Sequence, residues 1–219
     1  MAIRRLDEIN LPSEYDNKIT DIDKWLDNYY KTMPATEEQK ERRKDLAKEM
    51  RDILILVLLL MREMAERDAF DYDYILTVFT VEFTNALGGK IRVDDYITEY
   101  IDRFTNEFVD TTIEHVVENK EASYMMSDDR ATIAGANVAN ALVGYEELQE
   151  AKDKGYTKKM WVSQRDKRVR DTHILADGQK RNIDDYFMVG GTAMMIPCDP
   201  DCEVVEEVAG CRCVCKFIR

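Results

Sequence analysis

All five cysteines of this chain lie within its last 22 residues, and their spacing is the first feature that indicates chemistry. Cys198 and Cys202 are separated by three residues, and Cys211 and Cys213 by one. Structural zinc takes four tetrahedral ligands, mostly cysteine sulfur and histidine nitrogen. His173 is a fifth candidate ligand. We therefore predict a structural zinc site drawn from His173, Cys198, Cys202, Cys211 and Cys213.

Two other interpretations of the cysteines stay open. Buried cysteine behaves as a small hydrophobic residue, so the five thiols could simply fill a core. Disulfides are the second alternative, for a protein held in an oxidised particle. The first ten residues, MAIRRLDEIN, contain no apolar run after their two arginines, so we expect no secretory signal. An odd number of clustered cysteines in such a chain favours thiols or metal over disulfides.

A second group of residues, between Trp161 and Gly178, mixes acids, bases and a histidine. Its members are Trp161, Asp166, Arg168, Arg170, His173, Asp177 and Gly178. In a catalytic interpretation, His173 is a general base that Asp166 or Asp177 orients. In a structural interpretation, Arg170 pairs with a carboxylate and Asp171 caps a short helix. No nucleophile accompanies the group, so we favour the structural interpretation and assign no catalytic residue.

The elements ahead of this group are predicted to be helices. Apolar residues recur every three or four positions in about five segments, the first over Asp16–Met33. Thr36 and Gln39 fit a capping box at the start of a long helix. We expect other helices to surround its apolar centre, Ile53–Met61, which has about half the length of a membrane span. Phosphate-binding loops and common hydrolase motifs are absent from the sequence, which favours a packing and interaction role for these helices.

The charge changes near residue 155. The chain has a net charge of −13, yet residues 156–219 contain 11 basic and 10 acidic residues. That leaves 20 of the 31 basic and 34 of the 44 acidic residues, a net −14, in residues 1–155. We predict an α+β chain with an acidic, all-helical domain over residues 1–155. A small β-rich, metal-stapled module follows over residues 156–219.

The predicted strands of the module explain how the cysteines come together. Turn pairs and short apolar runs predict strands over Lys159–Gln164, Gln179–Ile183 and Met194–Pro197. A last strand over Cys211–Phe217 would place Cys211, Cys213 and Cys215 on one face, because side chains alternate along a strand. A module of 64 residues is small enough to need a metal or disulfide for stability.

The module also carries an ordered series of motifs. In chain order they are Lys159-Met160-Trp161, Asp166, Arg168–His173, Asp177–Gln179, Phe187, Ile196–Pro200 and Cys211–Cys213. The series resembles the phage Mu F-like head morphogenesis family. That family shares a tryptophan strand, an Asp-x-Arg-x-Arg-x-x-His segment, an Asp-Gly turn, a Pro-x-Asp-Pro stretch and a closing Cys-Arg-Cys.

The chain departs from the family pattern at several positions. Ala134–Asn137 stands where family members often carry Arg-Thr-Glu. Cys198 stands where the family commonly has glycine, and Cys202 and Cys215 are additions. A metal site of His173, Cys211 and Cys213 would be shared by the family, whereas Cys198 and Cys202 would be peculiar to this chain.

The resemblance implies a minor head protein of a tailed bacteriophage, with a structural role in head morphogenesis. It implies contact with the portal protein and other head proteins, several copies in each particle, and release together with the DNA. The expected locations are the virion and, during assembly, the host cytoplasm. The helices would then be the partner-binding part.

Two alternative functions remain. One is a phage-delivered effector or zinc-dependent enzyme that uses the Asp/Arg/His group. A catalytic zinc keeps an open coordination position for water, whereas a structural zinc is closed by four protein ligands. The other is a zinc module that contacts DNA through Lys158–Arg181, a stretch with eight positive and three negative residues.

Overall fold

The computed structural model describes residues 21–117 and 122–219, and their contacts form two compact units. The first unit contains residues 48–135, and the second contains residues 21–47 together with residues 136–219. The start of the predicted Asp16–Met33 helix and the first ten residues lie outside the described residues. The division into domains at residue 155 remains a prediction.

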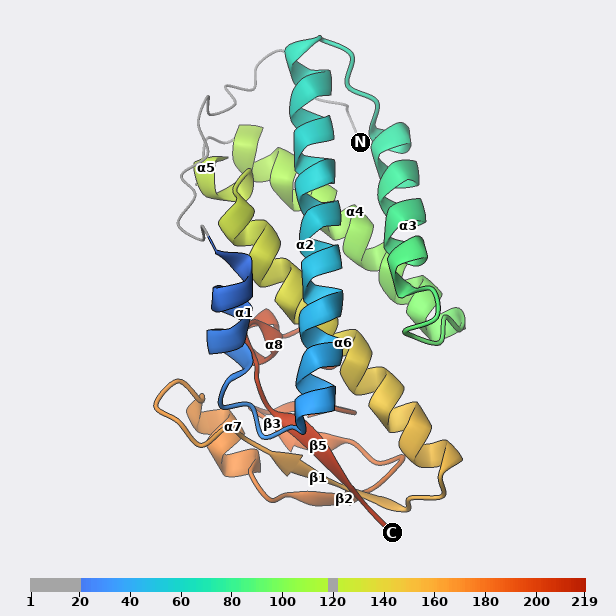
Figure 1. The fold of residues 1–219 in the computed structure, drawn as a ribbon, viewed down its shortest axis with the longest axis vertical. Coiled ribbons are helices and arrows are strands. Elements are labelled where there is room, and N and C mark those ends of the chain that lie inside the picture. The colour runs from blue at the N-terminus through green and yellow to red at the C-terminus, as the bar shows by residue number, and fades with distance from the viewer. Residues whose placement is uncertain (1–20, 118–121) are drawn as a thin grey trace. The chain divides into compact units, whose positions relative to one another are not determined.

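Helices fill most of the described chain, and short strands follow near its C-terminal end (Figure 1). The helices are α1 Ile22–Tyr30, α2 Glu37–Glu66, α3 Tyr72–Leu87, α4 Asp95–Val117, α5 Ala122–Met125, α6 Asp128–Asp153, α7 Asp171–Ala176 and α8 Val205–Val208. The strands are β1 Lys158–Val162, β2 Lys180–Asn182, β3 Phe187–Val189, β4 Thr192–Met194 and β5 Val214–Ile218. The predicted α+β class, with helices first and a β-rich part near the C-terminus, is confirmed.

Aromatic packing holds α3 and α4 together in the first unit. The ring of Phe79 meets those of Phe104 and Phe108 edge-on, with centroids 6.1 and 5.7 Å apart. Phe83 contacts Phe104 in the same way, at 5.7 Å. Edge-to-face pairs of this kind are favourable beyond the area that they bury.

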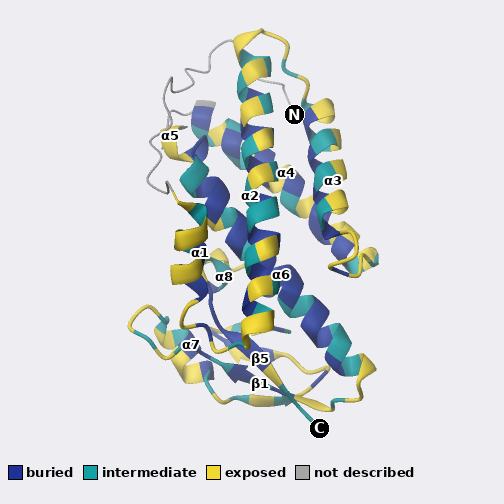
Figure 2. Ribbon diagram, in the orientation of Figure 1, coloured by how far each residue is buried: buried dark blue, intermediate teal, exposed yellow. Residues whose placement is uncertain are grey.

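The apolar centre of α2 is buried on one side only. Val57 and Leu58 are 0% and 1% exposed, whereas Leu56 and Leu59 are 46% and 47% exposed. The expectation that other helices surround Ile53–Met61 is therefore wrong, because the helix has a single buried face. Figure 2 shows buried and exposed positions alternating along α2. Within the described residues, no helix is long and apolar enough to cross a membrane.

Capping residues fix the helix starts as the sequence predicts. In the second unit, the amide of Gln39 donates to the Thr36 hydroxyl at 3.2 Å, and the Thr36 amide donates to the Gln39 side chain at 2.9 Å. These reciprocal bonds confirm the capping box ahead of α2. In the first unit, Asp94 accepts from the Ile97 amide at 2.9 Å at the start of α4.

The second unit contains both sheets. A three-stranded antiparallel sheet has the order β2-β1-β5, and β3 pairs with β4 in a hairpin. Trp161 on β1 lies opposite Cys215 on β5. The Trp161 side chain is fully buried in a core that also includes Phe187 of β3 and Leu148 of α6. The C-terminal part of α6 therefore belongs to the core of the sheets.

Two predicted strands differ from the observed ones. The last strand begins at Val214, so Cys211 and Cys213 lie in the loop ahead of β5. The Cys211 carbonyl accepts from the Asn140 side chain at 3.0 Å, so a side chain takes the place of a neighbouring strand. The predicted Met194–Pro197 strand is wrong beyond its first residue, because β4 covers Thr192–Met194 and the chain turns after it.

Lys159 is a buried cation in the core of the second unit. Its ammonium donates to the Met195 carbonyl at 2.8 Å and lies 5.3 Å from the centre of the Phe187 ring. Burial lowers the pKa of Lys159 to about 8, from an ordinary value of 10.5. The side chain is therefore neutral in the folded chain and charged in the unfolded chain between these two pH values.

The buried lysine predicts a specific pH dependence of stability. The unfolded state binds more protons than the folded state between pH 8 and 10.5, so this residue increases stability as the pH rises through that window. We expect the stability of the parent, measured relative to Lys159→Met by urea unfolding, to increase from pH 8 to 10. A difference that stays constant over this range would contradict the prediction.

Candidate metal centre

His173, Cys211 and Cys213 come together in the second unit. The Nδ1 atom of His173 lies 3.6 Å from Cys211 Sγ and 3.4 Å from Cys213 Sγ, and the three atoms lie within 4.8 Å of one another. All three side chains are buried. Helix α7 supplies the histidine, and the loop ahead of β5 supplies the cysteines.

The imidazole of His173 is held from its other side by Glu207 on α8. The two side chains meet at His173 Nε2 and Glu207 Oε2, 2.9 Å apart, and the hydroxyl of Thr172 donates to the same oxygen at 2.8 Å. A carboxylate that accepts from Nε2 leaves Nδ1 unprotonated in the neutral ring, with its lone pair toward the two sulfurs. Metal-binding histidines commonly have such a partner.

The carboxylate that contacts His173 is Glu207, and not Asp166 or Asp177 as the sequence suggested. Asp177 accepts from the Ser163 amide at 2.8 Å and from the Arg165 side chain at 2.8 Å. Asp166 pairs with Arg212, at 3.1 Å from its Nη1 atom. The alternative in which Asp166 or Asp177 orients His173 is therefore wrong.

Three side chains anchor the backbone that leads into Cys211. Asn137 on α6 accepts from the Gly210 amide at 2.8 Å, and Asn140 donates to the Cys211 carbonyl at 3.0 Å. Arg170, which precedes α7, donates to the Ala209 carbonyl. Arg170 thus binds a backbone carbonyl where the sequence predicted a carboxylate. The loop is fixed from both α6 and α7.

The pKa values of Cys211 and Cys213 shift in opposite directions. The pKa of Cys211 lies well below its usual value, because hydrogen bonds from the Cys198 and Cys213 thiols lower it and the nearby His173 adds to this effect, against the effect of burial. The pKa of Cys213 is raised by the neighbouring Cys211 and by burial, although the Trp161 indole and the Gln164 amide oppose the rise. Burial lowers the pKa of His173, yet Cys211 and Glu207 outweigh it and raise the value overall.

The other three cysteines occupy different positions. Cys198 is buried, with Sγ 3.2 Å from the Cys211 carbonyl oxygen, so it borders the group. Cys202 is partly exposed, and its Sγ lies 3.7 Å from the Val204 carbonyl. Cys215 is buried on β5 beside Lys159, and burial raises its pKa to about 12. The parts that Cys198 and Cys202 play as ligands remain predictions.

The remaining motif residues have structural surroundings. The Trp161 ring meets the rings of His173 and Phe187 edge-on, at 5.4 Å in both cases. Gly178 has φ +78°, and its amide donates to the Trp161 carbonyl at 2.9 Å. Arg168 contributes its backbone amide, which donates to Asp166 at 2.9 Å. These contacts explain the segment as scaffolding around the histidine.

Sequence reasoning did not identify Glu207 or the two asparagines. Glu207 lies 34 residues beyond His173 in an acidic segment that looks like a solvated loop. No local pattern marks Glu207 as a buried position, because Val204 and Val205 beside it are exposed. Asn137 and Asn140 lie on an otherwise small and apolar helix, where buried amides require a partner.

Gly190 makes room for the Glu207 carboxylate. A Cβ atom at Gly190 would lie 2.0 Å from Glu207 Oε1, whereas one at Gly191 would meet nothing within 4 Å. Both glycines have a positive φ, +58° and +86°, so alanine is strained at either position by about 1–2 kcal/mol. The two positions therefore form a matched pair.

We expect Gly190→Ala to reduce metal affinity and Gly191→Ala to leave it unchanged. The new methyl group would push the Glu207 carboxylate away from His173, and loss of such a partner typically weakens metal binding about 10–100-fold. A competition titration against a chromophoric chelator measures this difference. Equal affinities in the two variants, with similar losses of thermal stability, would contradict the role given to Glu207.

The donor set decides which metals fit. Two buried sulfurs and one imidazole nitrogen are the ligands that zinc takes in structural sites, and they match hard, oxygen-seeking cations poorly. The carboxylate behind the imidazole completes the arrangement expected around zinc. The residues therefore fit a thiophilic divalent metal.

Comparison with known proteins places the chain in a family. The model of the family described as Phage Mu protein F like protein matches residues 79–216. No curated protein and no solved structure matches the chain. The matched segment extends ahead of the cysteine-rich module and includes α4 and α6. The chain therefore belongs to the Phage Mu protein F like family, a family of structural proteins related to the phage head.

Proposed function

We propose that this chain is a minor head protein of a tailed bacteriophage, built into the capsid during head morphogenesis and bound to the portal protein. The family match over residues 79–216 carries this proposal, because it covers most of the helices as well as the module. We further propose several copies in each particle and release with the DNA. The chain would act by binding other head proteins and would not be an enzyme.

The acidic helices support a role in binding partners. Leu56 and Leu59 on α2 and Val81 on α3 expose apolar side chains in the first unit, each between 46% and 49% exposed. Exposed apolar residues mark a binding surface where they form a contiguous patch. We propose that this unit supplies the contact with other head proteins.

Cross-linking of purified particles tests the proposal. We expect the chain to be present in mature heads and to cross-link to the portal protein. Chain present only in the lysate and absent from particles would contradict the capsid role. Chain inside particles but cross-linked solely to the major capsid protein would contradict the portal contact alone.

We also propose that His173, Cys211 and Cys213 bind a structural zinc ion. The observation that carries this is the buried set of two sulfurs and an imidazole within 4.8 Å, backed by Glu207. Elemental analysis of protein purified without chelator should find about one zinc per chain, as one such site requires. Protein that contains no metal and does not bind added zinc would contradict the site.

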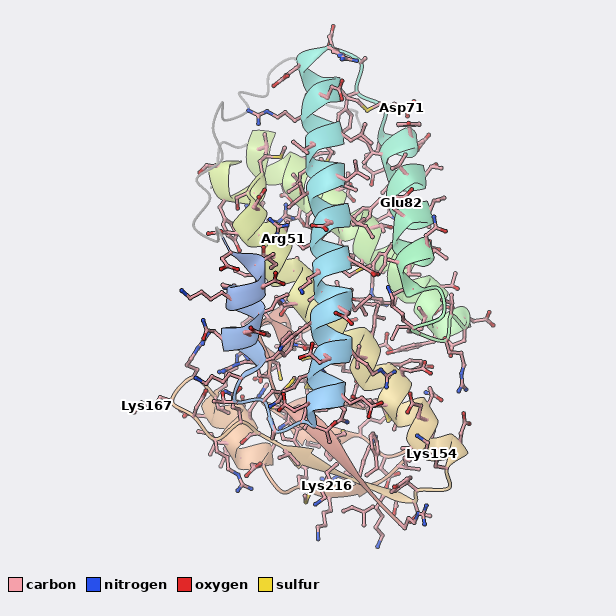
Figure 3. The ribbon with its side chains drawn as sticks, viewed as in Figure 1. Arg51, Asp71, Glu82, Lys154, Lys167 and Lys216 are labelled. Carbon is pink, nitrogen blue, oxygen red and sulfur yellow. The ribbon has the colours of Figure 1, made fainter. Side chains whose placement is uncertain are left out.

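A second candidate function, contact with DNA, has one observation in its favour. In the sheet register Met160 lies between Lys180 of β2 and Lys216 of β5, so both lysines share a face with Lys158. The three lysines are exposed. In Figure 3 the side chain of Lys216 extends from β5 to the outside of the molecule. The three lysines form a basic patch that shares Lys158 and Lys180 with the predicted Lys158–Arg181 stretch.

Salt-dependent binding to duplex DNA tests the patch. If the full chain binds DNA, its affinity falls with salt, and the slope of log K against log salt concentration counts the phosphate contacts. Replacing Lys158, Lys180 and Lys216 by glutamine should reduce that slope by about 3, because each phosphate contact contributes roughly 1 to it. Replacing Lys24, Lys31 and Lys90, which lie outside the sheet, provides the control. No binding at low salt would exclude this function.

A further inference from the structure

We propose that Cys198 is the fourth ligand of the metal, so that the site is closed and has no position for water. This inference rests on the zinc site proposed above and goes beyond it, because it decides what kind of zinc site this is. It also separates Cys198 from Cys202, which the sequence treats as a pair.

The position of Cys198 is the first observation. Its side chain is 3% exposed, and its Sγ atom lies 3.2 Å from the carbonyl oxygen of Cys211. It lies outside the group in which His173, Cys211 and Cys213 are all within 4.8 Å of one another. Cys198 therefore approaches the three ligands from the side of Cys211. Tetrahedral coordination requires a fourth ligand beside His173, Cys211 and Cys213, and the buried Cys198 thiol borders these three side chains.

The backbone at Cys198 is the second observation. Its φ is +59°, in the left-handed region that costs a residue with a Cβ about 1–2 kcal/mol. Asp199 fixes the turn, because its carboxylate accepts from the Met195 and Asp201 amides. Strain of this kind persists where a side chain must point in a required direction. Here the required direction is toward Cys211.

The burial of the four side chains is the third observation. Cys198, Cys211, Cys213 and His173 are each at most 5% exposed. Cys202, by contrast, is partly exposed and turns to the Val204 carbonyl. Solvent thus has little access to the group. With Cys198 bound, the four positions of a zinc ion are filled by three sulfurs and one nitrogen, which favours a structural role over hydrolysis.

Cobalt substitution provides the test on the full chain. Cobalt(II) bound to cysteine shows a sulfur-to-metal charge-transfer band whose intensity follows the number of thiolates. Cys198→Gly removes the thiol and also relieves the positive φ, so the backbone favours the variant. We expect this variant to lose about a third of the band, as three thiolates become two. We also expect its zinc affinity to fall by at least about 100-fold, more than loss of an outer partner causes.

Added 2-mercaptoethanol distinguishes a metal site with an open coordination position from a closed site. It should restore the band in Cys198→Gly, because the vacated position accepts an external thiol, and should leave the parent unchanged. Cys202→Ser is the matched control and should match the parent in band and affinity. An unchanged band in Cys198→Gly, or a parent whose band rises with added thiol, would overturn the closed site while the zinc proposal stands. A parent that binds neither cobalt nor zinc would overturn both.

Discussion

Replacing Cys211 and Cys213 together by serine should abolish metal binding and unfold residues 156–219. Both sulfurs belong to the group around His173, and both lie in the core that contains Trp161. Structural zinc contributes apparent binding energies of about 10–16 kcal/mol in small domains, which exceeds the stability of most small folds. The rest of the second unit should lose part of its core contacts, since Leu148 and Ala151 of α6 pack in the same cluster.

Hydrogen–deuterium exchange locates this effect. Amides in β1, β5 and α7 should exchange as in an unfolded chain, whereas those of α3 and α4 in the first unit should keep their protection. Cys202→Ser, at a partly exposed thiol outside the group, should exchange like the parent. A double variant that melts and exchanges like the parent would show that the cysteines only fill space.

The second large effect is expected at a buried ion pair, Arg43 with Glu147. The two side chains are 2% and 6% exposed and form two hydrogen bonds of 2.7 and 2.8 Å between α2 and α6. Removing one partner of such a pair leaves an isolated buried charge. We therefore expect Arg43→Met to lower the free energy of unfolding by about 3–5 kcal/mol, as measured by urea unfolding of metal-saturated protein.

The neighbouring pair, Arg42 with Glu150, supplies the control. Its side chains are 31% and 35% exposed, so Arg42→Met should cost about 0–1 kcal/mol. The double variant Arg43→Met with Glu147→Leu should recover most of the loss, because apolar side chains often replace a buried pair at little cost. If Arg43→Met and Arg42→Met destabilise equally, burial does not set the strength of the pair.

The helices were predictable because local signals define them. Thr36 and Gln39 satisfy each other across one turn, and glycines end α3, so a few neighbouring residues determine each boundary. The loop that carries Cys211 and Cys213 was predicted as a strand, because distant residues and not local signals determine its structure. Its alternating pattern is local, but its hydrogen bonds come from Asn140 and Arg170, which are distant in sequence.

The sequence predicts which cysteines and histidine could form the candidate site, but it does not predict their supporting residues. Cysteine and histidine are recognised as candidate ligands from their residue type alone. The structure brings His173, Cys211 and Cys213 together. Glu207 is one glutamate among many in an acidic chain, and only the fold shows that it meets His173. The strained backbone at Cys198 likewise has no signal in the sequence.

The second unit is made from two segments, residues 21–47 and 136–219, with the first unit between them in the sequence. On a ribosome that adds roughly 5–20 residues each second, α1 and the start of α2 emerge roughly 10–30 seconds before their last partners are made. During that interval Arg43 has no Glu147, and Leu26 and Tyr30 have no finished core. The continuous segment 48–135 makes its internal contacts without waiting for residues 136–219, which lets it fold first. Helix α1 and the start of α2 therefore complete their core only after residues 136–219 are made.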